Sequence, residues 1–293
     1  MSASWIDVPL PAGLRLGTSS YYWAEWHGPF YPVDLPVNDR LSWYATQFDT
    51  VEIDATFYRS PSRRQVSGWA LKTPPEFLIS LKVPRTITHD AGMVDCDAET
   101  AEFLSALEPL GPRQGPLLLQ FPYVAKSVNR HEYESGVGLR RALAAWLPRW
   151  APHADWVVEV RNLTWIDRPL IDLLAEHEVS LAFNAYYTMP NLTSLFEQDR
   201  FDPLTGRWAY VRFLGDHRRL DRLNDELVAD GAKPEGYCEL IVDRERELRT
   251  WVDALLPVLG RRPVLAYFNN HYAGFGPGSA RMFARLWDEI HGA

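Results

Sequence analysis

Short apolar segments alternate with helix-like segments eight times along this 293-residue chain, and this alternation restricts the fold more than any other feature. The apolar segments have the length and continuous hydrophobicity of strands that are buried on both faces. The predicted strands are Leu14–Ser19, Thr50–Thr56, Phe77–Val83, Pro116–Phe121, Trp156–Val160, Ser180–Asn184, Trp208–Phe213 and Pro263–Phe268. The amphipathic segments between them predict helices over Arg40–Phe48, Ser62–Lys72, Ala98–Leu110, Leu139–Trp150, Pro169–His177, Leu240–Leu259 and Gly278–Ile290.

Eight β/α units favour a closed (β/α)8 barrel, an α/β TIM barrel, over an open doubly wound sheet. No Gly-x-Gly-x-x-Gly motif follows the first predicted strand, which weakens the dinucleotide-binding alternative. No linker divides the chain, so we expect residues 1–293 to form a single domain. Two long connections, Tyr186–Arg207 and Leu214–Gly236, indicate either lids and binding loops or short helices that cap the barrel.

Composition narrows the class of protein. The formal net charge of −8 argues against general electrostatic adhesion to duplex DNA or to an anionic membrane. Two cysteines, Cys96 and Cys238, are too few for a disulfide framework. No basic start precedes an apolar run at the N-terminus, and no run approaches the length of a membrane span. We therefore expect a cytoplasmic protein without a membrane partner.

Polar residues gather where the predicted strands end. Side chains two residues apart on a strand share a face, so Glu52 and Asp54 should point the same way, as should Glu159 and Arg161. Barrel enzymes carry their chemistry at the carboxyl ends of their strands, so these groups are predicted to converge in one pocket. The polar residues at or just after the strand ends are Thr18, Glu52, Asp54, Lys82, Gln120, Glu159, Arg161, Asn184, Arg212, Asn269 and Asn270.

Several motifs resemble those of the YecE-like proteins (domain of unknown function 72), in order and over almost the whole chain. They are Gly17-Thr18-Ser19, Trp26-His27-Gly28-Pro29, Thr50–Tyr58, Leu81–Arg85 with Ile87-Thr88-His89, Leu118–Pro122, Glu159-Val160-Arg161 with Trp165, Tyr210-Val211-Arg212 and Tyr267–Asn270. The resemblance implies a TIM barrel and no settled activity. Two positions depart from the family pattern: Asp54 stands where Asn is frequent, and Phe121 replaces a more usual Leu.

Two carboxylates on non-adjacent strands, Glu52 and Glu159, suggest acid–base catalysis, because a carboxyl pair in a dry pocket can separate its pKa values. The alternative is a structural ring of salt bridges in which cations neutralise both groups. Lys82 and His89 complete the set of predicted catalytic residues. The reaction class stays open among hydrolase, lyase and isomerase.

Three cations, Lys82, Arg161 and Arg212, suggest an anion clamp for a small phosphorylated or acidic ligand. We predict no cofactor; a divalent metal ion at Glu52, Asp54 and Glu159 remains an alternative that the scarcity of histidines at strand ends disfavours. The remaining predicted substrate-binding residues are Thr18, Asp54, Tyr58, Gln120, Trp165, Asn184, Asn269 and Asn270, with the aromatic rings as stacking surfaces.

These features support three hypotheses on function. The first is a barrel enzyme that acts on an anionic sugar-like or nucleotide-like substrate. The second is a barrel that binds or processes nucleic acid, with an architecture like that of endonuclease IV, which the interleaved aromatic and Arg residues favour and the net charge of −8 opposes. The third is a ligand-binding protein without catalysis.

Overall fold

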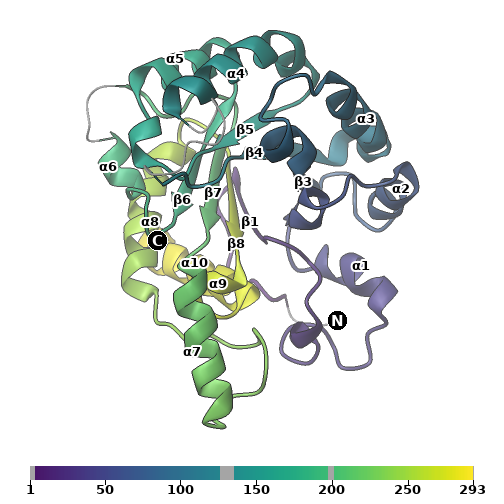
Figure 1. The fold of residues 1–293 in the computed structure, drawn as a ribbon. Coiled ribbons are helices and arrows are strands. Elements are labelled where there is room, and N and C mark those ends of the chain that lie inside the picture. The colour runs from purple at the N-terminus through teal and green to yellow at the C-terminus, as the bar shows by residue number, and fades with distance from the viewer. Residues whose placement is uncertain (1–3, 126–134, 197–200, 293) are drawn as a thin grey trace.

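The computed structural model describes residues 4–125, 135–196 and 201–292, and it confirms the (β/α)8 barrel. Eight parallel strands run through its centre, and the helices form a ring outside them (Figure 1). The strands are β1 Leu14–Thr18, β2 Thr50–Ile53, β3 Leu78–Lys82, β4 Gln114–Gln120, β5 Trp156–Glu159, β6 Ser180–Ala185, β7 Ala209–Phe213 and β8 Val264–Phe268.

The α-helices of the described residues include the seven that the sequence predicts, with shifts at their ends. They are α1 Arg40–Tyr44, α2 Arg63–Leu71, α3 Asp97–Leu107, α4 Gly136–Trp150, α5 Arg168–Glu176, α6 Leu192–Phe196, α7 His217–Ala229, α8 Glu245–Leu259, α9 Asn270–Ala273 and α10 Gly276–His291. Side-chain caps define several starts: Ser62 accepts from the Gln65 amide before α2, and Asp167 accepts from the Leu170 amide before α5.

The barrel closes where β1, the first strand of the chain, pairs with β8, the last strand. The strand order is β1-β8-β7-β6-β5-β4-β3-β2, and β1 pairs with β8 in register from Leu14 with Val264 to Thr18 with Phe268. Between β1 and β2 the strand pairing in the described residues is a single bridge, Ser19 with Glu52. The backbones come close there, because a Cβ added to Gly17 would lie 2.2 Å from the Thr50 carbonyl oxygen. Only glycine fits that approach.

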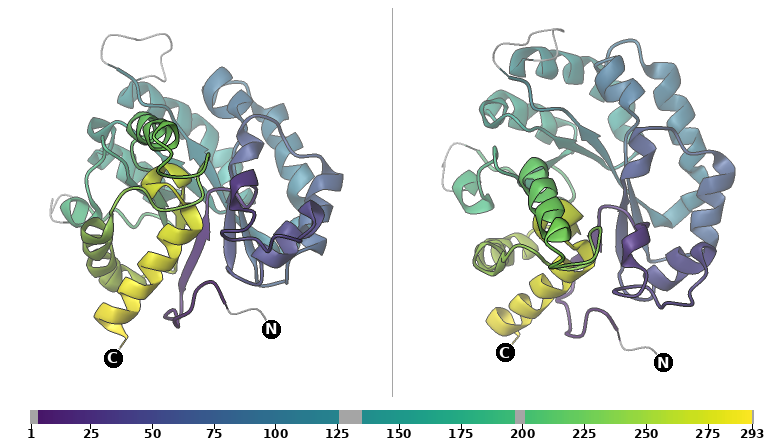
Figure 2. Two further views of the ribbon diagram at one scale, coloured as in Figure 1. Left: turned by 90° about the horizontal axis from the view of Figure 1, so that it is seen from below. Right: turned by 60° about the horizontal axis from the view of Figure 1, so that its bottom comes forward.

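The core has an outer and an inner part. Outward residues such as Ile79, Leu119 and Val211 pack beneath the helices in one continuous apolar layer. Figure 2 shows this ring of helices from two further directions. The N-terminal segment packs against the start of α10, where the Trp5 indole Nε1–H donates to the Pro277 carbonyl at 2.8 Å. Among the described residues, no helix is long and apolar enough to cross a bilayer.

One detail of the prediction needs correction. Strand β2 ends at Ile53, and Asp54–Phe57 forms a 3₁₀ turn, so Asp54 does not continue the strand face of Glu52. Of the two alternatives for the long connections, helices are present, α6 in the first and α7 in the second. The prediction of a lid over Tyr186–Arg207 includes residues 197–200, which lie outside the described part of the chain.

Candidate active site at the carboxyl end of the barrel

Strand alternation builds the site in two inward-facing layers. The lower layer is a separate apolar cluster inside the barrel that consists of Leu118, Val157, Ala182, Tyr210, Leu265 and Tyr267. Two residues further along each strand the chain presents the same face again. Those positions carry Glu52, Lys82, Gln120, Glu159, Asn184, Arg212 and Asn269. The strand-end positions of the sequence are therefore the upper inner layer of the barrel.

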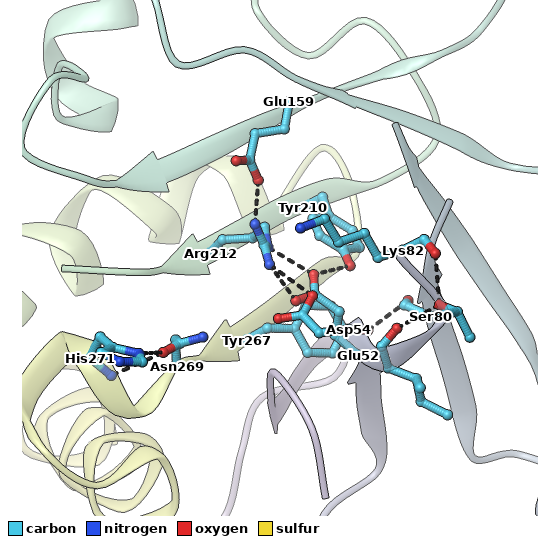
Figure 3. Close-up of polar contacts among 12 residues, drawn as sticks. Glu52, Asp54, Ser80, Lys82, Glu159, Tyr210, Arg212, Tyr267, Asn269 and His271 are labelled. Carbon is cyan, nitrogen blue, oxygen red and sulfur yellow. Dashed lines mark hydrogen bonds and ion pairs between the residues drawn. The ribbon is translucent and has the colours of Figure 1, made fainter. Parts of the chain in front are cut away.

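Arg212 lies at the centre of this layer and binds three carboxylates (Figure 3). Its Nε and Nη2 donate to Glu52 at 2.8 and 2.7 Å, and its Nη1 donates to Glu159 at 2.6 Å. Nη2 also lies 3.3 Å from Asp54. The Arg212, Glu52 and Glu159 side chains are 0–1% exposed, whereas Asp54 is 29% exposed. A ring of salt bridges, one of the two alternatives for these carboxylates, is thus present in the structure.

Burial and the neighbouring charges set the ionisation of this cluster. Burial by itself raises the pKa of Glu159, but Arg212 and Arg161 outweigh it and hold the value at about 2. Burial raises the pKa of Glu52, and Arg212 offsets this only in part. Burial opposes the charge on Arg212, yet Glu159, Glu52 and Asp54 raise its pKa well above the usual value. Glu159 is therefore a permanent carboxylate near neutral pH.

The lower layer supports the cluster through two tyrosines that sequence analysis missed. The Tyr210 hydroxyl donates to Glu52 Oε2 at 2.6 Å. The Tyr267 hydroxyl lies 2.6 Å from the Thr50 hydroxyl and 2.9 Å from the Ser80 hydroxyl, which joins β8 to β2 and β3 across the barrel. Both tyrosines stand two residues before a predicted site residue, and this spacing is the signal that could have revealed them.

Lys82 differs from the two arginines of the cluster. Its Nζ lies 4.0 Å from the centre of the Phe57 ring, and among the described residues no carboxylate lies within ion-pair distance of it. Figure 3 shows its side chain extending toward Arg212 and Tyr210. Burial lowers the pKa of Lys82; Arg212 and Arg161 lower it further, and Asp54 and Glu159 act against them. Lys82 is thus a partly buried amine whose charged form is disfavoured mainly by burial.

Two further groups stand beside Lys82. The His89 ring packs on Phe57 with the ring centres 4.8 Å apart, and its Nδ1 lies 2.8 Å from the Thr88 hydroxyl. Burial, followed by the charge of Lys82, lowers the pKa of His89 to about 4, so the imidazole is neutral at pH 7. Arg161 donates through Nε to Glu159 at 2.9 Å, which leaves its terminal Nη groups out of that ion pair.

Other predicted site residues lie outside this cluster. Thr18 bonds to the Tyr44 hydroxyl beneath α1, and Tyr58 is 77% exposed on the surface. Trp165 lines a separate cavity of about 530 Å³ beside the start of α4. Asn270 accepts from the Gly276 amide and so anchors the start of α10. Their predicted roles in substrate binding stay predictions.

Three of the predicted site residues with side-chain amides, Gln120, Asn184 and Asn269, lie in the upper inner layer of the barrel. The Gln120 Nε2 donates to the Phe121 carbonyl at 2.7 Å, and the Asn184 Nδ2 donates to the Val160 carbonyl at 3.4 Å. The Asn184 Oδ1 is buried without a hydrogen-bond partner among the described residues. Asn269 accepts from the backbone amide and from Nδ1 of His271. His271 stacks on His217 at 4.2 Å, a contact that the sequence did not indicate.

The carboxylates do not form a metal site. Glu52, Asp54 and Glu159 all contact the Arg212 guanidinium, which lies where a bridging cation would have to bind. Among residues 4–125, 135–196 and 201–292, no three His, Cys, Asp or Glu side chains are grouped to hold an ion. The donor set therefore does not fit the alternative of a divalent metal at these carboxylates.

The fold and the cluster together define a TIM-barrel protein whose strand ends hold a buried arginine between carboxylates. A family model described as "Protein of unknown function DUF72" matches residues 15–292, and the chain belongs to this family. The UPF0759 protein YunF of Bacillus subtilis is 26% identical over 288 residues, which cover 91% of this chain and 92% of that protein. The UPF0759 protein YecE of Escherichia coli K12 is 39% identical over 82 residues, only 30% of its length.

Solved structures share the fold. A DUF72 family protein from Thermotoga maritima superimposes with a TM-score of 0.66 at 22% identity, covering 96% of this chain and 99% of that one. A family 2 AP endonuclease from Brucella melitensis has a TM-score of 0.50 at 12% identity, covering 95% and 98% of the two chains. At these identities the likeness concerns the barrel and not its chemistry.

Proposed function

We propose that this protein is an enzyme that binds a small anionic substrate, sugar-like or nucleotide-like, at the carboxyl end of the barrel. Arg161 supplies the positive contact to the substrate, and Lys82 lies beside it. Glu52, Arg212 and Glu159 form a rigid floor beneath the substrate and hold Arg161 in place. The observation that carries the proposal is the arrangement of Arg161 and Lys82: the Arg161 Nη groups lie outside its ion pair with Glu159, and among the described residues no carboxylate lies within ion-pair distance of Lys82.

An anion bound beside Lys82 would stabilise the charged form of this side chain, which burial disfavours. The partial exposure of Asp54 and Arg161, 29% and 19%, leaves the cluster accessible from the solvent side. The Arg212 side chain is only 1% exposed and is bound to Glu52 and Glu159, so we place it in the floor of the site and not in contact with the substrate.

In this proposal the two carboxylates, Glu52 and Glu159, are not the acid and base that the sequence suggests. A carboxylate whose pKa is about 2 supplies no proton near neutral pH, so Glu159 is a positioning residue in this proposal. Glu52 is bound by Arg212 and Tyr210 and shares that role. Lys82 and His89, both with lowered pKa values, are the groups that exchange protons with the substrate.

Calorimetric titration of phosphate, sulfate, ribose 5-phosphate and AMP into the wild type tests the proposal. A charge-assisted contact to phosphate contributes about 1.5–3 kcal/mol, so Arg161→Gln should weaken binding roughly ten- to a hundredfold. Lys72→Gln is the matched control, because Lys72 donates to the Asn38 carbonyl on the outer surface. Absence of anion binding in the wild type, or equal affinity in Arg161→Gln, would contradict the proposal. Tight binding of single-stranded DNA instead would favour the nucleic-acid alternative.

A further inference from the structure

The lysines of this chain differ sharply in their surroundings. The sequence has four: Lys72, Lys82, Lys126 and Lys233. Lys233 donates to the Asn224 side chain and to two backbone carbonyls at 2.6–2.9 Å, and Lys72 donates to a backbone carbonyl at 2.7 Å. Lys82 contacts an aromatic ring and has no acceptor among the described residues. Of Lys72, Lys82 and Lys233, Lys82 is therefore the one whose nitrogen is not engaged by a hydrogen-bond acceptor of the described residues.

The surroundings also favour a neutral amine at Lys82. Only the neutral form has the lone pair that attacks an electrophile. Burial is the main cause of the lowered pKa, and Arg212 and Arg161 add to it. Asp54 and Glu159 act in the opposite direction, and both are also bound to arginine.

Proton carriers stand next to the amine. His89 and Lys82 pack against the same Phe57 ring, and His89 is neutral at pH 7, so it can accept a proton. Asp54 is the most exposed carboxylate of the cluster and is the strongest carboxylate influence on Lys82. Two groups, His89 and Asp54, can therefore carry protons between the Lys82 amine and an oxygen atom of a bound substrate.

From this arrangement we propose that Lys82 is the nucleophile of the site and forms an imine with an aldehyde or ketone that carries an anionic group. The nitrogen attacks the carbonyl carbon, and one amine proton passes through His89 to the oxygen, giving a carbinolamine. The carbinolamine loses its hydroxyl group as water and becomes the imine. One C–N bond forms, one water leaves, and no oxidant or reductant is consumed. The inference rests on the proposed function, because Arg161 binds the anionic group.

Reductive trapping tests this step. The full chain is incubated at pH 7.5 with pyridoxal 5′-phosphate, a phosphorylated aldehyde whose imine absorbs visible light, and separately with dihydroxyacetone phosphate. Sodium borohydride then fixes any imine as a stable secondary amine, and peptide mass spectrometry locates it. We expect the label at Lys82 in preference to Lys72 and Lys233, since each unit of lowered pKa gives about tenfold more free amine at neutral pH.

Two variants separate the imine from anion binding. Lys82→Arg keeps the positive charge but cannot form an imine, so it should abolish trapping and retain phosphate affinity within a few fold. Arg161→Gln should reduce trapping of the phosphorylated aldehydes and leave trapping of neutral propanal unchanged. Lys72→Arg is the control for both, and thermal melts verify that each variant is folded.

The outcomes distinguish the two proposals. Anion binding without a label at Lys82 overturns the imine and leaves the proposed function standing. Neither binding nor labelling overturns both. Labelling of Lys72 to the same extent as Lys82 indicates ordinary surface reactivity and also overturns the imine.

Discussion

Replacement of Arg212 by Gln tests whether the centre of the cluster is structural. The substitution removes a guanidinium that contacts three carboxylates at 2.6–3.3 Å and is 1% exposed. Removing one partner of a buried ion pair costs about 3–5 kcal/mol, because the remaining charges stay buried without a counterion. The entropy of unfolding is about 2.1 cal/mol/K per residue, so roughly 0.6 kcal/mol/K for this chain, and the melting temperature should fall by about 5–8 °C.

The assay is a thermal scan of wild type and Arg212→Gln at pH 7 and again at acidic pH. Without the arginine, burial should hold the pKa of Glu52 above that of the unfolded chain, so the penalty should shrink as the pH falls through it. The gap between the two proteins should therefore narrow on acidification. Arg207→Gln is the control, since its ion pair with Asp155 is largely exposed and contributes about 1 kcal/mol or less.

A variant that melts within about 2 °C of the wild type at pH 7 would refute this reasoning, since an exposed ion pair contributes no more than that. An unchanged melting temperature together with weaker anion binding would indicate that Arg212 belongs to the predicted anion clamp. A lower melting temperature with unchanged anion affinity of the folded protein would support its place in the floor of the site.

Three further predictions concern the same layers. The pKa of Glu159 is lowered, so wild-type stability should fall as the pH drops from about 4.5 to 2, and Glu159→Gln should flatten this part of a urea–pH series. Tyr210→Phe removes a buried donor to a carboxylate and should cost about 1.5–3 kcal/mol in urea unfolding, and no loss would contradict the contact. Gly17→Ala places a Cβ 2.2 Å from a backbone oxygen and should lower the melting temperature, whereas Gly68→Ala, with open space around it, should not.

The order of strands and helices follows from the sequence because it depends on local pattern. Buried parallel strands are continuously apolar, as in Leu117–Leu119, and amphipathic segments lie between them. Caps such as Ser62 and Asp167 mark helix starts within a few residues. The inward direction of Glu159 and Arg212 also follows, since period-two alternation relates each to an apolar inner residue two positions earlier.

The distribution of partners among the charged residues depends on tertiary structure alone. From the sequence, Lys82, Arg161 and Arg212 are the three cations of one predicted anion clamp. The barrel brings β2 and β5 to opposite sides of Arg212, so that its three nitrogens are occupied, while Lys82 meets an aromatic ring instead. A strand pattern specifies which face a side chain takes, but the distance between strands far apart in sequence exists only once the barrel closes.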